Sequence, residues 1–344
     1  MPPPVDKLTP TDPRVQHRTY TIPHSNKTYH YLFADSPSQT PTATVLLVHG
    51  FPDLAFGWRY QVPFLLARNL RVIAPDLPGF GRSDAPPALG AYSFKAVVDD
   101  LAALLAHEGI VEKVVLGGHD WGGAVVWRFV LWRPELVRGV FSVCTPFWLP
   151  SEVYLSKKEV VRRLPNFGYQ AQFDGTEVDE GVVGREKIRA FLSIMFGARR
   201  RDGQVVFDVA KGVRVDKLEP KEIGETPLLS REEMEFYVDE YVRNGIRGPL
   251  SWYKTGRVNY DEERKLIEDG KTRVTVPALM VVAKRDSALP PIMAAGMGQH
   301  CDSLVTKQVD ATHWALWEAP AETNKHIGEF LDGLLGGAPL KASI

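Results

Sequence analysis

The sequence predicts an α/β protein: a mostly parallel central sheet with helices on both faces and one helical insertion. Two observations support this fold class. Short, continuous apolar runs alternate with segments whose apolar residues recur at the spacing of a helix, as expected for parallel strands joined by crossover helices. This alternation stops between about residues 148 and 257, where charged helical patterns take over.

Most of the strand-like runs are short and mainly apolar, which indicates burial on both faces of the sheet. These runs occupy residues 44–48, 70–74, 114–116, 140–143, 278–283 and 304–309. Helical spacing covers residues 94–107 and 124–132, and Pro134 stops the second helix. The first forty residues are rich in Pro, Thr and His, and we expect an irregular arm with edge strands there.

The insertion is expected to form a lid, called the cap below. Helical patterns cover residues 151–164, 185–196 and 230–244, and Ser230 with Glu233 forms a capping box that predicts a helix start. Sheets of this kind place their sites at the carboxyl edge, so we expect the cap to cover that edge. The predicted core comprises residues 1–147 and 258–344, and the cap comprises residues 148–257.

Composition excludes several classes of function. The 344 residues carry 41 Lys and Arg against 42 Asp and Glu, a balance that gives no surplus of positive charge for nucleic acid or an anionic membrane. Cys144 and Cys301 are too few for a disulfide framework. No apolar stretch reaches the ~18 residues of a membrane helix, and the first residues lack a secretory pattern. We expect a soluble, cytoplasmic enzyme, with a monomer as the default.

The most informative motif is GGHDWGG at residues 117–123, between a strand-like run and a helical pattern. A nucleophile flanked by small residues at a strand-to-helix turn is typical of the nucleophile elbow, where serine is usual. Here the central residue is Asp120. An aspartate is already ionised at neutral pH, and it suits attack on saturated carbon such as that of an epoxide or an alkyl halide. The product would be an ester of Asp120, which water must then cleave.

Two downstream residues have the order expected for the partners of Asp120. Asp286 follows the run 278–283, and His313 follows the run 304–309. Nucleophile, acid and histidine occur in this chain order in hydrolases with such an elbow, and a carboxylate on one imidazole nitrogen leaves the other free to take a proton from water. Taken singly, Asp286 could be a helix cap and His313 a loop histidine. Their order after the elbow favours the catalytic interpretation.

The segment His49-Gly50-Phe51-Pro52 follows the first strand-like run. In this fold, one donor to an oxyanion is the amide after the nucleophile, here Trp121, and the other comes from the loop after an early strand, here Phe51. These amides would stabilise the charge that builds when water attacks the ester. A simple turn ended by a proline is the alternative interpretation.

At this point the chain resembles the soluble epoxide hydrolases of the α/β-hydrolase fold. The resemblance covers essentially the whole chain after the arm, and it rests on residues 49–53, 58–61, 76–83, 118–123, 284–286 and 310–314. Two tyrosines of the cap bind and protonate the epoxide oxygen in this family. Residues 166–170 and 247–254 resemble their surroundings, which implies these roles for Tyr169 and Tyr253. A cap tyrosine that only lines an apolar pocket is the alternative.

The resemblance implies conversion of lipophilic epoxides to vicinal diols through an ester of Asp120, which water activated by His313 hydrolyses. The expected partners are a small epoxide and water, with no metal and no organic cofactor. We expect an apolar, aromatic pocket to which five residues contribute: Phe51, Trp121, Phe147, Trp148 and Trp314.

Two alternatives remain. A haloalkane dehalogenase uses the same Asp and His chemistry, and the amide or indole of Trp121 could hold a halide. Against it, Phe51 stands where many dehalogenases have asparagine, and paired tyrosines have no role in halide release. The second alternative is a non-catalytic binding protein on the same fold, although all three catalytic positions hold competent residues.

Overall fold

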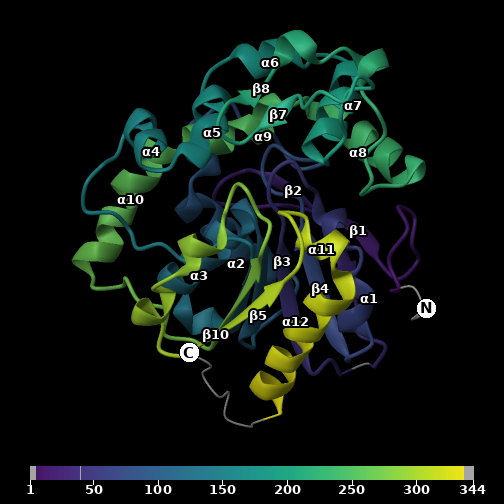
Figure 1. The fold of residues 1–344 in the computed structure, drawn as a ribbon. Helices are drawn as coiled ribbons and strands as arrows, with labels where there is room; N and C mark the ends of the chain where they lie inside the picture. Colours follow the sequence, from purple (N-terminus) through teal and green to yellow (C-terminus); the bar gives the residue numbers. More distant parts are fainter. Residues whose placement is uncertain (1–4, 39, 337–344) are drawn as a thin grey trace.

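The computed structural model describes residues 5–38 and 40–336 (Figure 1). Within these residues, the main sheet has the strand order β1-β2-β4-β3-β5-β6-β9-β10. The part from β4 to β10 is parallel, whereas β2 runs antiparallel to both β1 and β4. The strands are β1 (Gln16–Thr21), β2 (Thr28–Ala34), β3 (Ala43–Val48), β4 (Leu70–Pro75), β5 (Val114–His119), β6 (Val137–Val143), β9 (Ala278–Ala283) and β10 (Leu304–Val309).

Helices cover both faces of this sheet (Figure 1). Helix α3 packs on β5 and β6 with α2 beside it, while α1 packs on β4 and α12 packs on β9 and β10. The helices of the core are α1 (Gln61–Leu66), α2 (Phe94–His107), α3 (Trp121–Trp132), α11 (Ala315–Glu318) and α12 (Pro320–Leu335). The expected layered α/β architecture is therefore confirmed.

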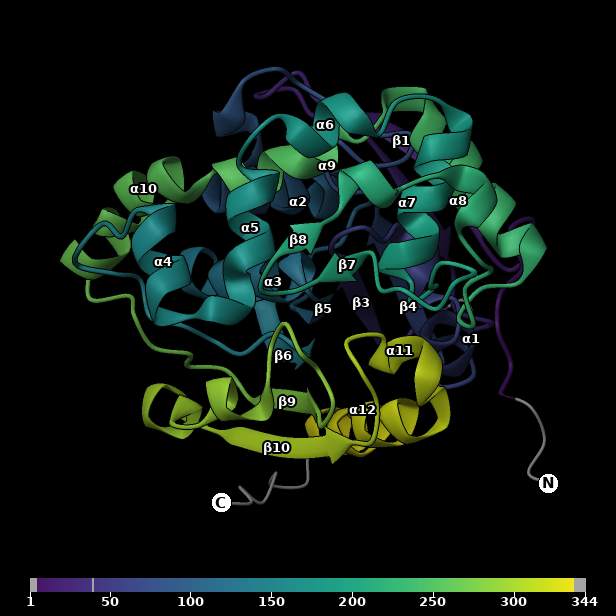
Figure 2. The same ribbon diagram turned by 45° about the horizontal axis from the view of Figure 1, so that its top comes forward.

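The insertion between β6 and β9 lies over the carboxyl ends of the parallel strands (Figures 1 and 2). It contains α4 (Lys157–Arg163), α5 (Gly168–Phe173), α6 (Glu177–Gly181), α7 (Arg185–Met195), β7 (Phe207–Asp208), β8 (Gly212–Val213), α8 (Arg231–Asn244), α9 (Arg247–Ser251) and α10 (Gly256–Glu268). The predicted boundary after residue 257 falls inside α10, which also contacts α2 of the core. The assignment of residues 148–257 to the cap stays a prediction.

Several predicted elements agree with the structure to the residue, namely the strands at 278–283 and 304–309 and the helix at 94–107. The capping box of Ser230 and Glu233 is also present. One prediction was wrong: helix α4 begins at Lys157, not at residue 151. Ser156 caps this helix in a box of its own with Glu159, so the preceding residues stay outside it.

Two of the parallel strands that precede site residues lie wholly within the core. Strands β5 and β9 are buried along their whole length, as expected for strands covered on both faces of a sheet. Both β5 and α3 extend into the motif at 117–123, so that Asp120 alone separates strand from helix. No helix of the described residues is long and apolar enough to cross a membrane.

Candidate active site

Asp120 lies at a sharp turn between β5 and α3. Its backbone has φ of 53° and ψ of −124°, a conformation that costs an L-residue about 1–3 kcal/mol. Glycines make the turn possible: a Cβ on Gly122 would lie 1.9 Å from the carbonyl oxygen of Val48, and one on Gly118 would lie 2.4 Å from that of Gly122. The carboxylate makes no cap hydrogen bond to α3. It is therefore available to groups outside its own helix.

The loop after β3 brings a backbone donor to this carboxylate. The amide of Phe51 donates to Oδ1 of Asp120 at 2.6 Å. Gly50 permits this approach, since a Cβ there would lie 2.3 Å from the same oxygen and 2.6 Å from the backbone nitrogen of Trp121. Trp121 is the first residue of α3, so its N–H has no acceptor within the helix. Both amides predicted as oxyanion donors thus lie beside Asp120.

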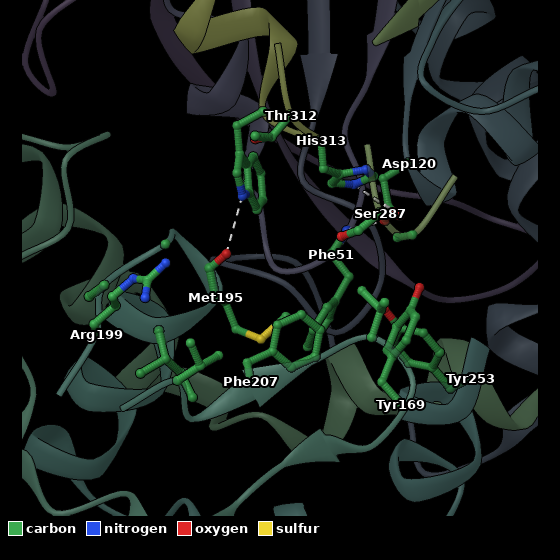
Figure 3. A pocket seen from close by; sticks show the side chains of 17 residues that line it. Phe51, Asp120, Tyr169, Met195, Arg199, Phe207, Tyr253, Ser287, Thr312 and His313 are labelled. Carbon is green, nitrogen blue, oxygen red and sulfur yellow. Dashed lines mark hydrogen bonds and ion pairs between the residues drawn. The ribbon is translucent and has the colours of Figure 1, made fainter. Parts of the chain in front are cut away.

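The other two predicted residues form a hydrogen-bonded pair at the same edge. Nδ1 of His313 lies 2.7 Å from Oδ2 of Asp286, and Nε2 lies 3.5 Å from Oδ2 of Asp120. Oδ1 of Asp286 accepts from the amides of Ala288 and Leu289, each at 2.9 Å. Asp286 is thereby fixed as an acceptor, and His313 lies between the two carboxylates. Figure 3 shows His313 beside Asp120.

The charges of this pair support each other. Burial alone would raise the pKa of Asp286, but the charge of His313, its hydrogen bond and the two backbone amides lower that pKa to about 2. Burial likewise opposes protonation of His313, but Asp286 and Asp120 together raise its pKa to about 10. While Asp120 is ionised, His313 is therefore held as an imidazolium.

The two cap tyrosines face Asp120 from the opposite wall (Figure 3). Tyr169 lies in α5, and Tyr253 lies in the short 3-10 helix Trp252–Lys254. Their rings meet edge to face with centroids 5.8 Å apart. The indole nitrogen of Trp252 donates to the carbonyl oxygen of Pro78 at 2.9 Å, which fixes the turn of Tyr253 on the core. The amide of Tyr169 donates to the carbonyl oxygen of Val209 at 2.9 Å.

Both phenols stay protonated. Burial is the main cause that raises the pKa of Tyr169 and of Tyr253 above the usual value, and the charge of Asp120 raises both further. The side-chain amide of Gln170 lies 3.4 Å from the hydroxyl of Tyr169 and is placed to donate to it. Because Gln170 is the donor in this contact, the hydroxyl hydrogen of Tyr169 is available to an acceptor bound in the cavity.

A cavity of about 240 Å³ lies between these walls. Its remaining lining is largely apolar, and it includes Ile194, Met195, Ala198, Val205, Phe207 and Val209 from the cap and Trp314 from the core. Of the five residues predicted to contact substrate, Phe51 and Trp314 line this cavity.

Three predicted substrate contacts do not line it. The ring of Trp121 packs against Trp252 and Tyr253, at centroid distances of 6.2 Å and 5.2 Å. Phe147 is buried against Trp127 of α3. Trp148 is 39% exposed, and its ring meets Phe167. The structure thus places these three side chains outside the cavity wall, and their contact with substrate stays a prediction.

Sequence reasoning missed three residues that join the parts of the site. His119 and Cys144 both point at the carbonyl oxygen of His313, with Nε2 and Sγ at 2.8 Å and 3.4 Å from it. Asn166 of the cap donates to the carbonyl oxygen of Ala288 at 2.7 Å, close to Asp286. Of these three residues, the sequence points only to His119, because His119 stands next to the nucleophile.

Among the described residues, His119, Cys144 and His313 form one group whose donor atoms lie within 4.8 Å of one another. All three residues already have partners, since Nδ1 of His313 faces Asp286, and Nε2 of His119 and Sγ of Cys144 both face the carbonyl oxygen of His313. We assign no metal ion to this group.

Comparison with known proteins identifies the class of protein to which this chain belongs. The family model for the alpha/beta hydrolase fold matches residues 43–180. Epoxide hydrolase A from Mycobacterium thermoresistibile has a similar structure, with a TM-score of 0.76 and 27% sequence identity, over 93% of this chain and 98% of that one. The protein is thus an α/β hydrolase.

Sequence relatives define the class more closely. Epoxide hydrolase srdG of Neurospora crassa is 45% identical over 96% of this chain and 99% of its own length. Epoxide hydrolase A of Mycobacterium tuberculosis is 32% identical over 84% of this chain and 90% of its own. Bifunctional epoxide hydrolase 2 of Rattus norvegicus is 34% identical, and the chain spans 51% of its length. The chain belongs to the epoxide hydrolases, which are hydrolases acting on ether bonds.

Proposed function

We propose that the protein converts lipophilic epoxides to vicinal diols through a covalent ester of Asp120. The observation that carries this proposal is that the two carboxylate oxygens of Asp120 have different partners. Oδ1 accepts from the amide of Phe51 at 2.6 Å, and Oδ2 lies 3.5 Å from Nε2 of His313. One oxygen is held by the backbone while the other remains on the side of the histidine and the cavity.

In the first step, Oδ2 of Asp120 attacks an epoxide carbon and the C–O bond of the ring breaks. The electron pair of that bond goes to the epoxide oxygen, which takes a proton from Tyr169 or Tyr253. Two phenols kept protonated by burial suit this role. The apolar lining of the cavity supports a lipophilic substrate.

In the second step, His313 takes a proton from water, and the resulting oxygen attacks the ester carbonyl carbon. The negative charge builds on Oδ1, which the amides of Phe51 and Trp121 stabilise. Collapse of this intermediate releases the diol and restores the carboxylate. His313 enters the cycle as an imidazolium, so it first gives its proton, through solvent or product, to the tyrosinate left by ring opening. The proton that it then takes from water restores the imidazolium, so that epoxide and water sum to the diol.

Esterification also switches the protonation of His313. The charge and the hydrogen bond of Asp120 are two of the causes that raise the pKa of His313. An ester of Asp120 carries no charge, so the pKa of His313 falls once the ester forms. The base therefore becomes available at the step that needs it.

The test is turnover of a panel of small epoxides by the purified protein, with the diols identified by chromatography. Formation of diol that is lost in Asp120→Ala supports the proposal. Absence of diol across aryl, terminal and internal epoxides would contradict it. Release of halide from bromoalkanes at comparable rates would favour the dehalogenase alternative, and ligand binding without turnover would favour a binding protein. The monomeric state and the location in the cytoplasm stay predictions.

A further inference from the structure

His119 has a hydrogen bond that the reaction described above does not use. It is the last residue of β5, directly before Asp120, and it is 1% exposed. Its Nε2 lies 2.8 Å from the backbone carbonyl oxygen of His313. One side chain therefore joins the turn that carries the nucleophile to the loop that carries the base, although these residues are far apart in the sequence.

The chemistry of this contact fixes the tautomer of His119. A carbonyl oxygen only accepts, so Nε2 carries the hydrogen and Nδ1 carries the lone pair. Burial and the nearby charge of His313 lower the pKa of His119 to about 4, so its ring is neutral. Nδ1 is buried and has no hydrogen-bond partner among the described residues. Leaving a buried acceptor unpaired is destabilising, and an apolar side chain of similar size would avoid this.

A second donor converges on the same carbonyl oxygen. Sγ of Cys144 lies 3.4 Å from it, and Cys144 follows β6 with a φ of 69°. Such a φ is uncommon for a residue other than glycine, and strain of this kind clusters at functional sites. The ends of the adjacent strands β5 and β6 thus each supply a donor to the backbone of His313.

We propose that His119 is a positioning residue for ester hydrolysis: its neutral imidazole holds the backbone of His313 at a fixed separation from Asp120. The inference rests on the proposed function. Asp286 orients the ring of His313 at Nδ1, and Arg285 and Glu318 hold the two residues that precede His313 in the loop. The bond from His119 acts on the backbone of His313 itself and ties it to Asp120, because the backbone of His119 is continuous with the nucleophile.

The alternative is simple packing. The ring of His119 lies near those of His313 and Trp314, with centroids 4.8 Å and 5.8 Å away. A leucine would fill this space without leaving an orphan nitrogen. A glutamine would supply an N–H to the carbonyl oxygen in place of Nε2. The two substitutions therefore separate the hydrogen bond from the packing.

The experiment measures ester formation and ester hydrolysis separately, by rapid mixing and mass spectrometry, in the native protein, His119→Leu and His119→Gln. We expect His119→Leu to slow ester hydrolysis about 10–100-fold, because a misplacement of about 1 Å can have an effect of this size. Ester formation should change less than about 3-fold, which corresponds to about 0.65 kcal/mol at RT of 0.59 kcal/mol. His119→Gln should retain hydrolysis within the same factor. Equal hydrolysis in His119→Leu and the native protein would overturn the proposal, and so would equal loss in both variants.

A second measurement does not depend on the reaction. Nitrogen NMR of the imidazoles should show His119 as the neutral Nε2–H tautomer across the neutral pH range. The Nδ1–H signal of His313 should broaden in His119→Leu and persist in His119→Gln. An Nδ1–H tautomer of His119, or an unchanged His313 signal in His119→Leu, would overturn the positioning role. If the native protein forms no ester at all, the proposed function fails, while this signal still decides whether His119 positions His313.

Discussion

The cavity has a core wall, which carries Asp120 and His313, and a cap wall, which carries Tyr169 and Tyr253. The two walls hold their polar groups in different ways. On the core wall, Asp286 accepts two backbone amides and the ring of His313, and each of these bonds is between 2.7 and 2.9 Å long. On the cap wall, Tyr169 and Tyr253 are held mainly by the aromatic rings around them, with centroid distances of 5.0 to 5.8 Å to Phe173, Phe207 and each other. Directional hydrogen bonds therefore fix the carboxylate and the imidazole on the core side, whereas the packing of aromatic rings is the main support of the two phenols on the cap side.

The largest effect is expected on the core wall, at the nucleophile itself. Asp120→Ala should lower diol formation by at least about 10⁴-fold, because the ester can no longer form. Asp310→Asn is the matched control, since its carboxylate lies on the surface in an ion pair with Arg285. Activity of Asp120→Ala within tenfold of the native protein would show that water attacks the epoxide directly.

Removal of the base should separate the two steps. His313→Gln should slow ester hydrolysis about 10²–10⁴-fold, so that the protein gains the mass of one substrate and retains it. Mass spectrometry of the intact protein measures this adduct. His300→Gln, outside the cavity lining, should behave as the native protein does. Fast turnover without an adduct in His313→Gln would assign the base to another residue.

Changes on the cap wall should affect ring opening alone. Tyr253→Phe and Tyr169→Phe should each slow ester formation about 10–100-fold by removal of one acid, while hydrolysis of the ester stays within about 3-fold. Tyr260→Phe, with its hydroxyl near the carbonyl oxygen of Glu152 at the surface, is the control. Equal slowing of both steps would mean that these tyrosines shape the site without supplying a proton.

A smaller effect concerns the pH at which His313 titrates. Asp286 and Asp120 raise its pKa to about 10 in the free protein, so it stays protonated at neutral pH. Asp120→Asn removes one of these charges, as an ester would, and should lower the pKa of His313. The base must be neutral, so ester hydrolysis should rise with pH through this lowered value. Titration of His313 by NMR in both proteins checks this, and equal pKa values would argue against the switch.

The core wall could be predicted from the sequence because its residues follow strands. Asp120, Asp286 and His313 each come shortly after a predicted strand, and parallel strands bring their carboxyl ends to one edge. The glycines around Asp120 also have a local cause, since the turn leaves no space for a Cβ. In these cases the pattern along the chain determines the position in space.

The cap wall could be predicted only in part. Tyr169 and Tyr253 came from the resemblance, not from a periodic pattern. Residues such as Met195, Val205 and Phe207 line the cavity because of how α7 and the ribbon of β7 and β8 pack on the core, and no local pattern carries that information. The same holds for His119 and Cys144, whose shared acceptor is the backbone of a residue distant in sequence.

The most direct test of the account is a single turnover in heavy-oxygen water, with the protein in excess over the epoxide. If Oδ2 of Asp120 attacks the epoxide, the first diol takes its oxygen from the carboxylate and contains no heavy oxygen. The label then enters Asp120 and appears in the diol only in later turnovers. Heavy oxygen in the diol of the first turnover would contradict the ester of Asp120 and, with it, the roles assigned to both walls.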